Sequence, residues 1–147
     1  MQTALRAAAA LIAFVALPLV ASAAAKPFPA LAGWDHTTPH QSTGRLTESY
    51  KKGDQLVTYL TDANLSYADQ LAAVKKNIAD NGIKPTMDTD LSCGGKHAHE
   101  VEMLLGITVY HQLLVDDSPG VTKVTYARAQ GSSPANDALA ALQGYCS

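Results

Sequence analysis

The clearest periodic segment of the chain spans residues 67–80, where apolar side chains recur every three or four positions. Ser66 precedes it and is a good N-cap, because its hydroxyl can accept a hydrogen bond from a free amide of the first turn. Asp69 lies in that turn, where a carboxylate suits the helix dipole. Asn81-Gly82 follows and supplies a left-handed stop. The pattern therefore predicts an α-helix over residues 67–80.

A second helix is predicted near the end of the chain. Ser133 can cap it, and Pro134 fits its first helical position, where no amide hydrogen is needed. Leu139 and Leu142 belong to its apolar stripe, and Cys146 comes one turn later on the same side. We therefore expect this helix to pack its apolar stripe, together with the cysteine, against the rest of the domain.

The remaining segments alternate between apolar and polar residues or form short runs of good strand formers. Turns that contain Gly separate these runs, so we expect antiparallel hairpins. One turn contains Pro119-Gly120, which suits the two central positions of a type II turn. The predicted strands are residues 43–50, 55–61, 86–92, 96–104, 107–115 and 121–127. The pattern predicts an α+β domain, with an antiparallel β-sheet of about six strands and two helices in the order ββαββββα.

The first 23 residues have the three-part order of a cleavable signal peptide. One positive charge, Arg6, precedes an apolar run over residues 7–20, and Ala21-Ser22-Ala23 provides a small-residue cleavage site. The apolar run is too short to cross a bilayer as part of the finished protein. No cysteine stands at the cleavage point, so we expect no membrane anchor after cleavage. This segment predicts a secreted or periplasmic protein.

The stretch between the signal and the domain lacks clear periodicity. Residues 24–42 contain three prolines, so we expect an irregular leader ahead of a single domain at residues 43–147. Phe28, Leu31 and Trp34 are the apolar anchors of this leader. We therefore expect part of the leader to pack on the domain.

Net charge limits the classes of partner. The chain carries 11 basic and 13 acidic residues, and loss of Arg6 with the signal makes the mature chain one unit more negative than the formal net charge of −2. Such a surface does not attract nucleic acid or anionic lipid by bulk electrostatics. The partner classes that remain are a protein or a small ligand.

Cys93 and Cys146 are the two cysteines of the chain. An even pair in an exported protein favours one structural disulfide, which here would tie the last helix to the sheet. The alternative is a pair of thiolates that serve a metal or redox site, and no CxxC spacing supports it. In the chain-entropy model a bridge over a loop of this length stabilises the fold by roughly 4 kcal/mol.

A candidate metal site lies in the string His97-Ala98-His99. Alternate residues of a strand point to the same face about 7 Å apart, so these two imidazoles could chelate zinc or copper. If the next strand pairs through a tight turn, His111 lies opposite His97 as a third ligand. Glu100 and Glu102 then face the other way. Two interpretations stay open, a zinc or copper site of His97, His99 and His111 or solvated histidines on an exposed sheet face.

The sequence assigns no catalytic residue. It contains no G-x-S-x-G nucleophile elbow, and both cysteines are better assigned to a bridge. The large aromatic residues either line a cleft for a small ligand or peptide, or pack the core. These residues are Trp34, Tyr50, Tyr59, Tyr110 and Tyr126.

The stretch from Glu48-Ser49-Tyr50 through Cys146 resembles the small exported domains of the PsbP-like and DcrB-like fold group. The likeness rests on the order of elements and on the string Val124-Thr125-Tyr126-Ala127-Arg128, which precedes a capped terminal helix. Proteins that look like this are mostly binding or assembly modules rather than enzymes. The resemblance implies a non-enzyme and transfers no site residue.

Together these observations predict an exported, non-enzymatic binding or accessory protein that acts through its sheet face or an edge strand. Its ligand is unknown, and no cofactor is expected in this interpretation. The alternative is a periplasmic zinc- or copper-binding protein that uses the H-x-H strand.

Overall fold

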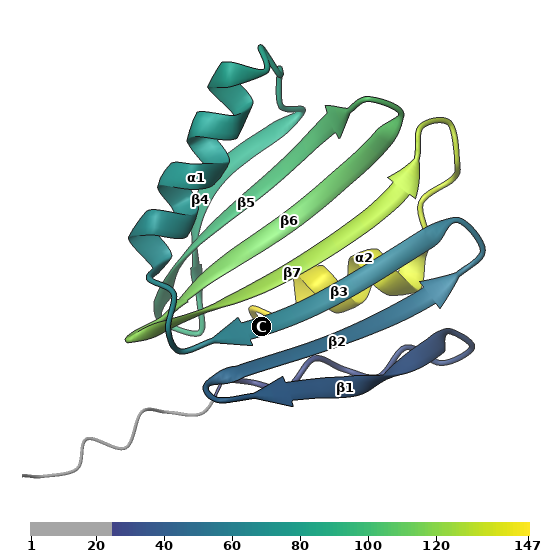
Figure 1. Cartoon of the computed structure of the whole chain (residues 1–147). Coiled ribbons are helices and arrows are strands. Elements are labelled where there is room, and N and C mark those ends of the chain that lie inside the picture. Colours follow the sequence, from purple (N-terminus) through teal and green to yellow (C-terminus); the bar gives the residue numbers. More distant parts are fainter. Residues whose placement is uncertain (1–24) are drawn as a thin grey trace, which may run out of the picture.

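The structure is a computed structural model that describes residues 25–147, so the predicted signal at residues 1–23 lies outside the described residues. It contains one seven-stranded antiparallel sheet and two helices (Figure 1). The strand order is β1-β2-β3-β7-β6-β5-β4. In chain order the elements are β1 (Asp35–Ser42), β2 (Arg45–Lys52), β3 (Gln55–Asp62), α1 (Tyr67–Asp80), β4 (Met87–Cys93), β5 (Lys96–Leu105), β6 (Thr108–Asp117), β7 (Gly120–Ala129) and α2 (Asn136–Gly144). The predicted α+β class is confirmed, and the sheet has one strand more than predicted.

The additional strand is β1, which lies in the stretch predicted to be an irregular leader. All of its residues are exposed, and it pairs with β2 at the edge of the sheet. Pro39 has no amide hydrogen to donate to a ladder, and the register between β1 and β2 shifts between Thr37 and His40. An edge position tolerates such a proline because only one side of the strand is paired. The prediction of irregular chain is therefore wrong for Asp35–Ser42.

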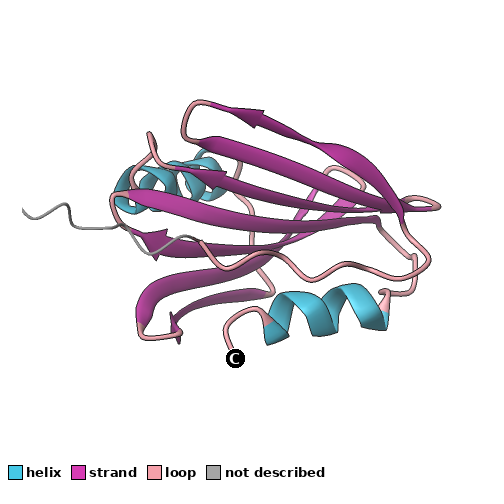
Figure 2. Cartoon of the chain, turned by 90° about the horizontal axis from the view of Figure 1, so that it is seen from below, coloured by secondary structure: helices cyan, strands magenta, loops and turns pink. Residues whose placement is uncertain are grey.

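The two helices lie on opposite sides of the sheet (Figures 1 and 2). Val57 of β3 pairs with Tyr126 of β7, and both side chains belong to the main core beside α2. We call this side of the sheet the α2 face. The alternate residues of the same strands, such as Lys123, point to the other side, which we call the α1 face. No helix of the described residues is long and apolar enough to cross a membrane.

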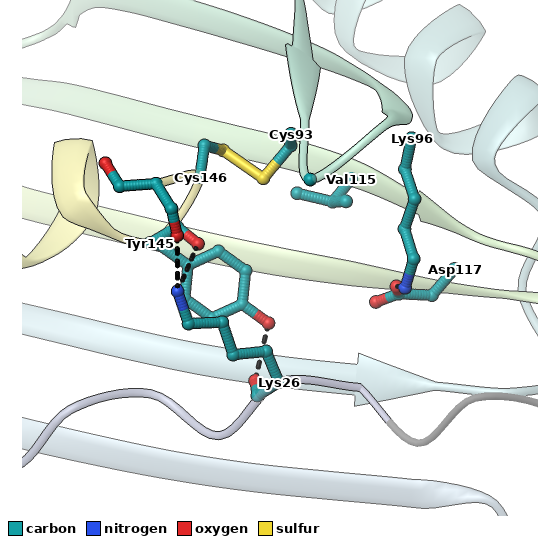
Figure 3. Close-up of a pocket in the computed structure, with 9 residues that line it drawn as sticks. Lys26, Cys93, Lys96, Val115, Asp117, Tyr145 and Cys146 are labelled. Carbon is teal, nitrogen blue, oxygen red and sulfur yellow. Dashed lines mark hydrogen bonds and ion pairs between the residues drawn. A yellow bond between two sulfur atoms is a disulfide. The ribbon is translucent and has the colours of Figure 1, made fainter.

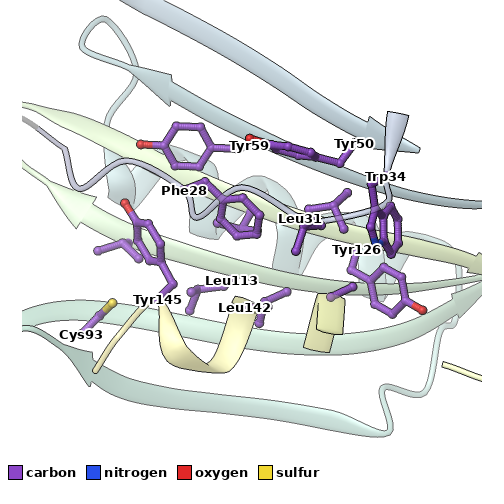
Figure 4. Packing of buried hydrophobic residues seen from close by; sticks show 14 of the residues in the cluster. Phe28, Leu31, Trp34, Tyr50, Tyr59, Cys93, Leu113, Tyr126, Leu142 and Tyr145 are labelled. Atoms are coloured by element: carbon purple, nitrogen blue, oxygen red, sulfur yellow. The ribbon is translucent and has the colours of Figure 1, made fainter. Parts of the chain in front are cut away.

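The α2 face holds the main core, and the segment before β1 completes it. Phe28, Leu31 and Trp34 are 6%, 8% and 7% exposed, as expected for apolar anchors. The Phe28 ring lies 5.9 Å from the rings of both Tyr50 and Tyr59, centroid to centroid (Figure 4). Figure 2 shows this segment running between the sheet and α2. The segment therefore fills the space that separates the terminal helix from the strands.

Helix α2 is fastened at both ends. It begins at Asn136, after Ala135, so the prediction that Ser133 caps it and Pro134 is its first residue is wrong. Ala135 has no capping side chain, and its amide donates a 2.8 Å hydrogen bond to the Tyr126 hydroxyl, which fixes the start of the helix to β7. Beyond its last turn, the predicted Cys93–Cys146 disulfide is confirmed, with the two Cα atoms 4.2 Å apart. The bridge ties the end of the chain to edge strand β4, as expected.

The turn between β6 and β7 differs from the prediction. Asp117 pairs with Gly120, so Ser118 and Pro119 occupy its centre, and the prediction that Pro119-Gly120 is central is wrong. Gly120 is buried against the end of β3, where an added Cβ would lie 2.6 Å from the carbonyl oxygen of Asp62. Glycine is therefore required there for the close approach of two strands rather than for the turn.

Candidate functional site

The register of β5 and β6 separates the three histidines predicted to bind a metal. His111 pairs with Glu102 rather than with His97, because Gly106 and Ile107 form the hairpin loop between the paired Leu105 and Thr108. The prediction paired His111 with His97, which lies five positions along β5 from its actual partner Glu102. A shift by an odd number of residues moves a side chain to the other face of the sheet. His97 and His99 therefore belong to the α1 face and His111 to the α2 face. The predicted His97, His99 and His111 site is wrong in its geometry.

His99 is buried on the α1 face and lies between two carboxylates of edge strand β4. Its Nδ1 is 2.8 Å from Asp90 Oδ1, and its Nε2 is 3.1 Å from Asp88 Oδ1. The hydrogen bond with His99 lowers the pKa of Asp90, and the charge of the imidazole acts in the same direction. These contacts join β4 to β5, and His97 stays exposed beside them. These two contacts explain why His99 can be buried, and they give it a structural role as a link between β4 and β5.

His111 has a similar arrangement on the α2 face. Its Nε2 lies 2.6 Å from Glu100 Oε1, and its Nδ1 lies 3.6 Å from Glu102 Oε2. Glu102 also accepts a 2.7 Å hydrogen bond from the Thr86 hydroxyl. Among the described residues, no group of three or more His, Cys, Asp or Glu side chains is arranged to hold a metal ion.

A pocket of about 200 Å³ lies beside the disulfide (Figure 3). Its charged groups have partners within the fold, because Lys96 pairs with Asp117 and the Lys26 ammonium donates to the backbone oxygens of Tyr145 and Ser147. The Tyr59 and Tyr145 hydroxyls both donate to the Lys26 carbonyl oxygen, at 2.7 and 2.6 Å. Burial raises the pKa of both phenols, so they stay protonated donors at neutral pH. These contacts fasten the two ends of the described chain to the core.

A further open space lies between α1 and the sheet. Helix α1 begins after Ser66, whose hydroxyl accepts from the Asp69 amide at 3.1 Å, and it ends at Asp80 before Asn81, as predicted. None of its 14 residues is buried. A groove of about 330 Å³ lies between one side of the helix and the strands of the α1 face, and we call this space the α1 groove. The helix therefore contacts the sheet at β6 but leaves part of the α1 face without close packing.

The α1 groove has an apolar wall and a polar wall. Met103 and Leu105 of β5 form the apolar wall, and Val74 faces them from α1. Gln112 of β6 and its cross-strand partner Thr125 of β7 contribute to the polar wall. Leu105 is 41% exposed, so the groove reaches the surface near the β5–β6 hairpin. A molecule with an apolar part and a polar part matches this arrangement.

Two polar groups of this wall are incompletely paired. The Gln112 side chain donates to the Thr125 hydroxyl at 3.2 Å, while its Oε1 is buried without a hydrogen-bond partner among the described residues. Lys123 is the one charged residue among the described residues that line the groove. Burial lowers the pKa of Lys123, and the positive charge of Arg45 acts in the same direction.

Sequence reasoning missed both groups but identified one other groove residue. Of the aromatic residues noted as either cleft or core, Tyr110 lines the α1 groove, whereas Trp34, Tyr50, Tyr59 and Tyr126 are buried in the core. A lysine at the inward-facing position of a strand rich in Val and Thr was a signal that could have identified Lys123.

Comparisons with known proteins add little to this picture. No family model matches the chain, and no curated protein matches it significantly. A crystal structure of a protein of unknown function from Pseudomonas aeruginosa is similar to it, with a TM-score of 0.40 and 18% sequence identity. The match covers 54% of this chain and 62% of that chain, which is less than two thirds of its length. We draw no conclusion about fold or function from a likeness of this size.

Proposed function

We propose that the chain is an exported, non-enzymatic binding protein that holds a small, mainly apolar ligand in the α1 groove. The observation that carries this proposal is the groove of about 330 Å³ between α1 and the strands, beside a helix that buries no residue completely. Binding sites for small ligands are concave and mostly apolar, contain a few polar groups, and enclose roughly 300–1,000 Å³. The α1 groove is open to the surface, has this kind of lining, and has a volume at the lower end of this range.

The apolar wall supports a binding role on energetic grounds. Filled with water alone, the groove would hold roughly ten molecules at about 30 Å³ each. Water beside Met103, Leu105 and Val74 has few polar partners on that wall. Transfer of an apolar ligand into the groove releases this water and is favourable.

Export is supported by two independent features. Residues 1–23 have the charge, apolar run and small-residue site of a signal peptide. The Cys93–Cys146 disulfide is the kind of bond that persists in an oxidising compartment. We infer that the mature protein acts in the periplasm or outside the cell, on a small ligand rather than on nucleic acid.

The groove is tested with the uncharged fluorescent probe N-phenyl-1-naphthylamine and the purified mature protein. Ala72 and Ala73 are both exposed residues of α1, and of the two only Ala73 lines the groove. Ala73→Phe places a ring in the groove and is expected to weaken probe binding about tenfold or more, while the matched Ala72→Phe is expected to bind like the wild type. Equal binding by both variants, or no binding by the wild type, would overturn the proposal.

A further inference from the structure

Lys123 is placed where a lysine has little to stabilise its charge. Its neighbours across the two adjacent strands are Leu60 and Leu114, which are 7% and 1% exposed. The ammonium forms no ion pair with any carboxylate of the described residues within 4.0 Å. A partly desolvated charge without a partner is costly to the folded state.

The carboxylates nearest to Lys123 by register are engaged elsewhere. Asp62 and Asp116 lie on the two adjacent strands, each opposite Val121, so they are diagonal neighbours of Lys123 on the same face. Asp62 contacts Arg45 at 3.5 Å and accepts from the Asn64 amide at 2.8 Å. Asp116 accepts from the amide and hydroxyl of Ser118. The fold therefore leaves Lys123 available to an external anion.

Helix α1 adds no competing charge to the groove. The residues of α1 that line the groove are Gln70, Ala73, Val74 and Asn77, and none of them is charged. Its own charged pair, Lys76 and Asp80, is exposed and closed on itself. The charge of the groove is therefore a single positive one, beside the unpaired amide oxygen of Gln112.

We propose that the ligand of the α1 groove is an anionic amphiphile, whose head group pairs with Lys123 while its apolar chain lies against Met103 and Leu105. This inference rests on the proposed function, because it names the chemical class of the ligand of the same groove. Charge complementarity supports it, since a charge-assisted hydrogen bond to a carboxylate or phosphate is roughly twice as strong as a neutral one. Lys123 on β7 lies two strand spacings from β5, about 10 Å, and by register Met103 lies four positions, about 13 Å, further along the strands. A head group at Lys123 therefore needs an extended apolar chain to reach Met103 and Leu105.

The lowered pKa of Lys123 fits this assignment. Burial disfavours the charged ammonium in the empty groove, and a bound anion would favour it again. Lysine commonly extends its ammonium to water while its aliphatic stem covers apolar surface, and such a lysine would not discriminate between head groups. The comparison of head groups is therefore the decisive measurement.

Isothermal titration calorimetry of the mature protein at neutral pH, below micelle concentrations, uses four ten-carbon probes: decanoate, decyl phosphate, decanol and decyltrimethylammonium. We expect an anionic probe to bind about tenfold or more tightly than decanol, and the cationic probe to bind most weakly. If decanoate binds more tightly than decyl phosphate, the ligand is a fatty acid, and the reverse order indicates a lipid phosphate. Either result supports the proposal.

Variants of Lys123 complete the test. Lys123→Met is expected to bind decanol and the anionic probe equally, whereas Lys123→Arg is expected to keep the preference for the anion. Lys75→Met is the matched control, because Lys75 is an exposed lysine of α1 that does not line the groove. Thermal unfolding checks the fold of each variant, and we expect Lys123→Met to be at least as stable as the wild type because it removes a desolvated charge.

The outcomes distinguish this inference from the proposed function. If decanol and the anions bind the wild type equally, and Lys123→Met binds them equally as well, the anionic ligand is excluded while the groove stays a binding site. If none of the probes binds, both the inference and the proposed function fail.

Discussion

The two helices of this domain differ in how they meet the same sheet, although both carry apolar residues at helical spacing. Helix α2 has nine residues and buries Ala138 and Leu142, whereas α1 has 14 residues and buries none. On the α2 face the space between helix and strands is filled by another part of the chain, which contributes Phe28, Leu31 and Trp34. On the α1 face no comparable segment of the described chain enters the space, and the α1 groove remains.

The difference shows that an apolar stripe does not by itself determine how closely a helix packs. Helix α2 is also fixed by the disulfide and by a 2.8 Å hydrogen bond from the Trp34 indole to Asp137. Helix α1 is supported by its Ser66 cap and by partial burial of side chains such as Leu71. We therefore expect the α2 face to account for most of the stability of the fold and the α1 face to serve binding.

The largest effect is expected from removal of the disulfide. The double variant Cys93→Ser, Cys146→Ser should lower the free energy of unfolding by about 4 kcal/mol, because the unfolded chain regains the entropy of a loop closed over 53 positions. Urea unfolding of the mature protein measures the loss, and reductant-treated wild type is the control. A loss below about 1 kcal/mol would show that the α2 face does not depend on the bridge.

A matched pair of leucine truncations compares the two helices directly. Leu142→Ala, on α2, removes a side chain that is 1% exposed and should cost about 3 kcal/mol. Leu71→Ala, on α1, removes a partly exposed side chain and should cost only about 1 kcal/mol. Chemical denaturation of both variants gives the two values, and equal costs would contradict the contrast between the helices.

The smallest effect concerns acid stability on the α2 face. The hydrogen bond from Trp34 holds the pKa of Asp137 below its usual value of 3.8. A lowered carboxyl pKa stabilises the fold above pH 3.8, and this contribution is lost as the pH falls through the folded-state pKa. Because the Asp137 side chain is 43% exposed, solvent screening limits the contribution to about 1 kcal/mol or less.

The variant Asp137→Asn should therefore show a smaller loss of stability between neutral and strongly acidic pH than the wild type. Unfolding curves across that pH range measure the difference in stability. NMR titration of the Asp137 carboxyl in the folded wild type measures the pH midpoint of its ionisation. A midpoint at or above 3.8 would remove the physical basis of the prediction.

Much of the local structure could be predicted from the sequence because local interactions specify it. The first helix has its predicted bounds, since the Ser66 cap and the Asn81-Gly82 stop act within a few residues. The Cys93–Cys146 bridge could be predicted because the chain has only these two cysteines and begins with a segment that resembles an export signal. The resemblance to the PsbP-like and DcrB-like fold group stays a prediction.

Other features needed the tertiary structure because they depend on partners distant in sequence. Strand β1 has no buried residue and contains Pro39, so its extended form depends on pairing with β2. The side of the sheet on which His111 lies depends on the position of the two-residue loop at Gly106 and Ile107. The alternation of apolar and polar residues within one strand does not show where that loop is. A small change in a turn therefore decided whether three histidines could meet.

The candidate site shows the same division. From the sequence it could be predicted that Lys123 occupies a strand, that residues 67–80 form a helix, and that the apolar residues of both recur with the appropriate period. The tertiary structure was needed to show that a groove remains between the helix and the strands and that the lysine lines this groove without a carboxylate partner. The physical reason is that periodicity specifies which side of an element faces inward, whereas the distance between elements depends on the volume of every side chain and segment that packs between them.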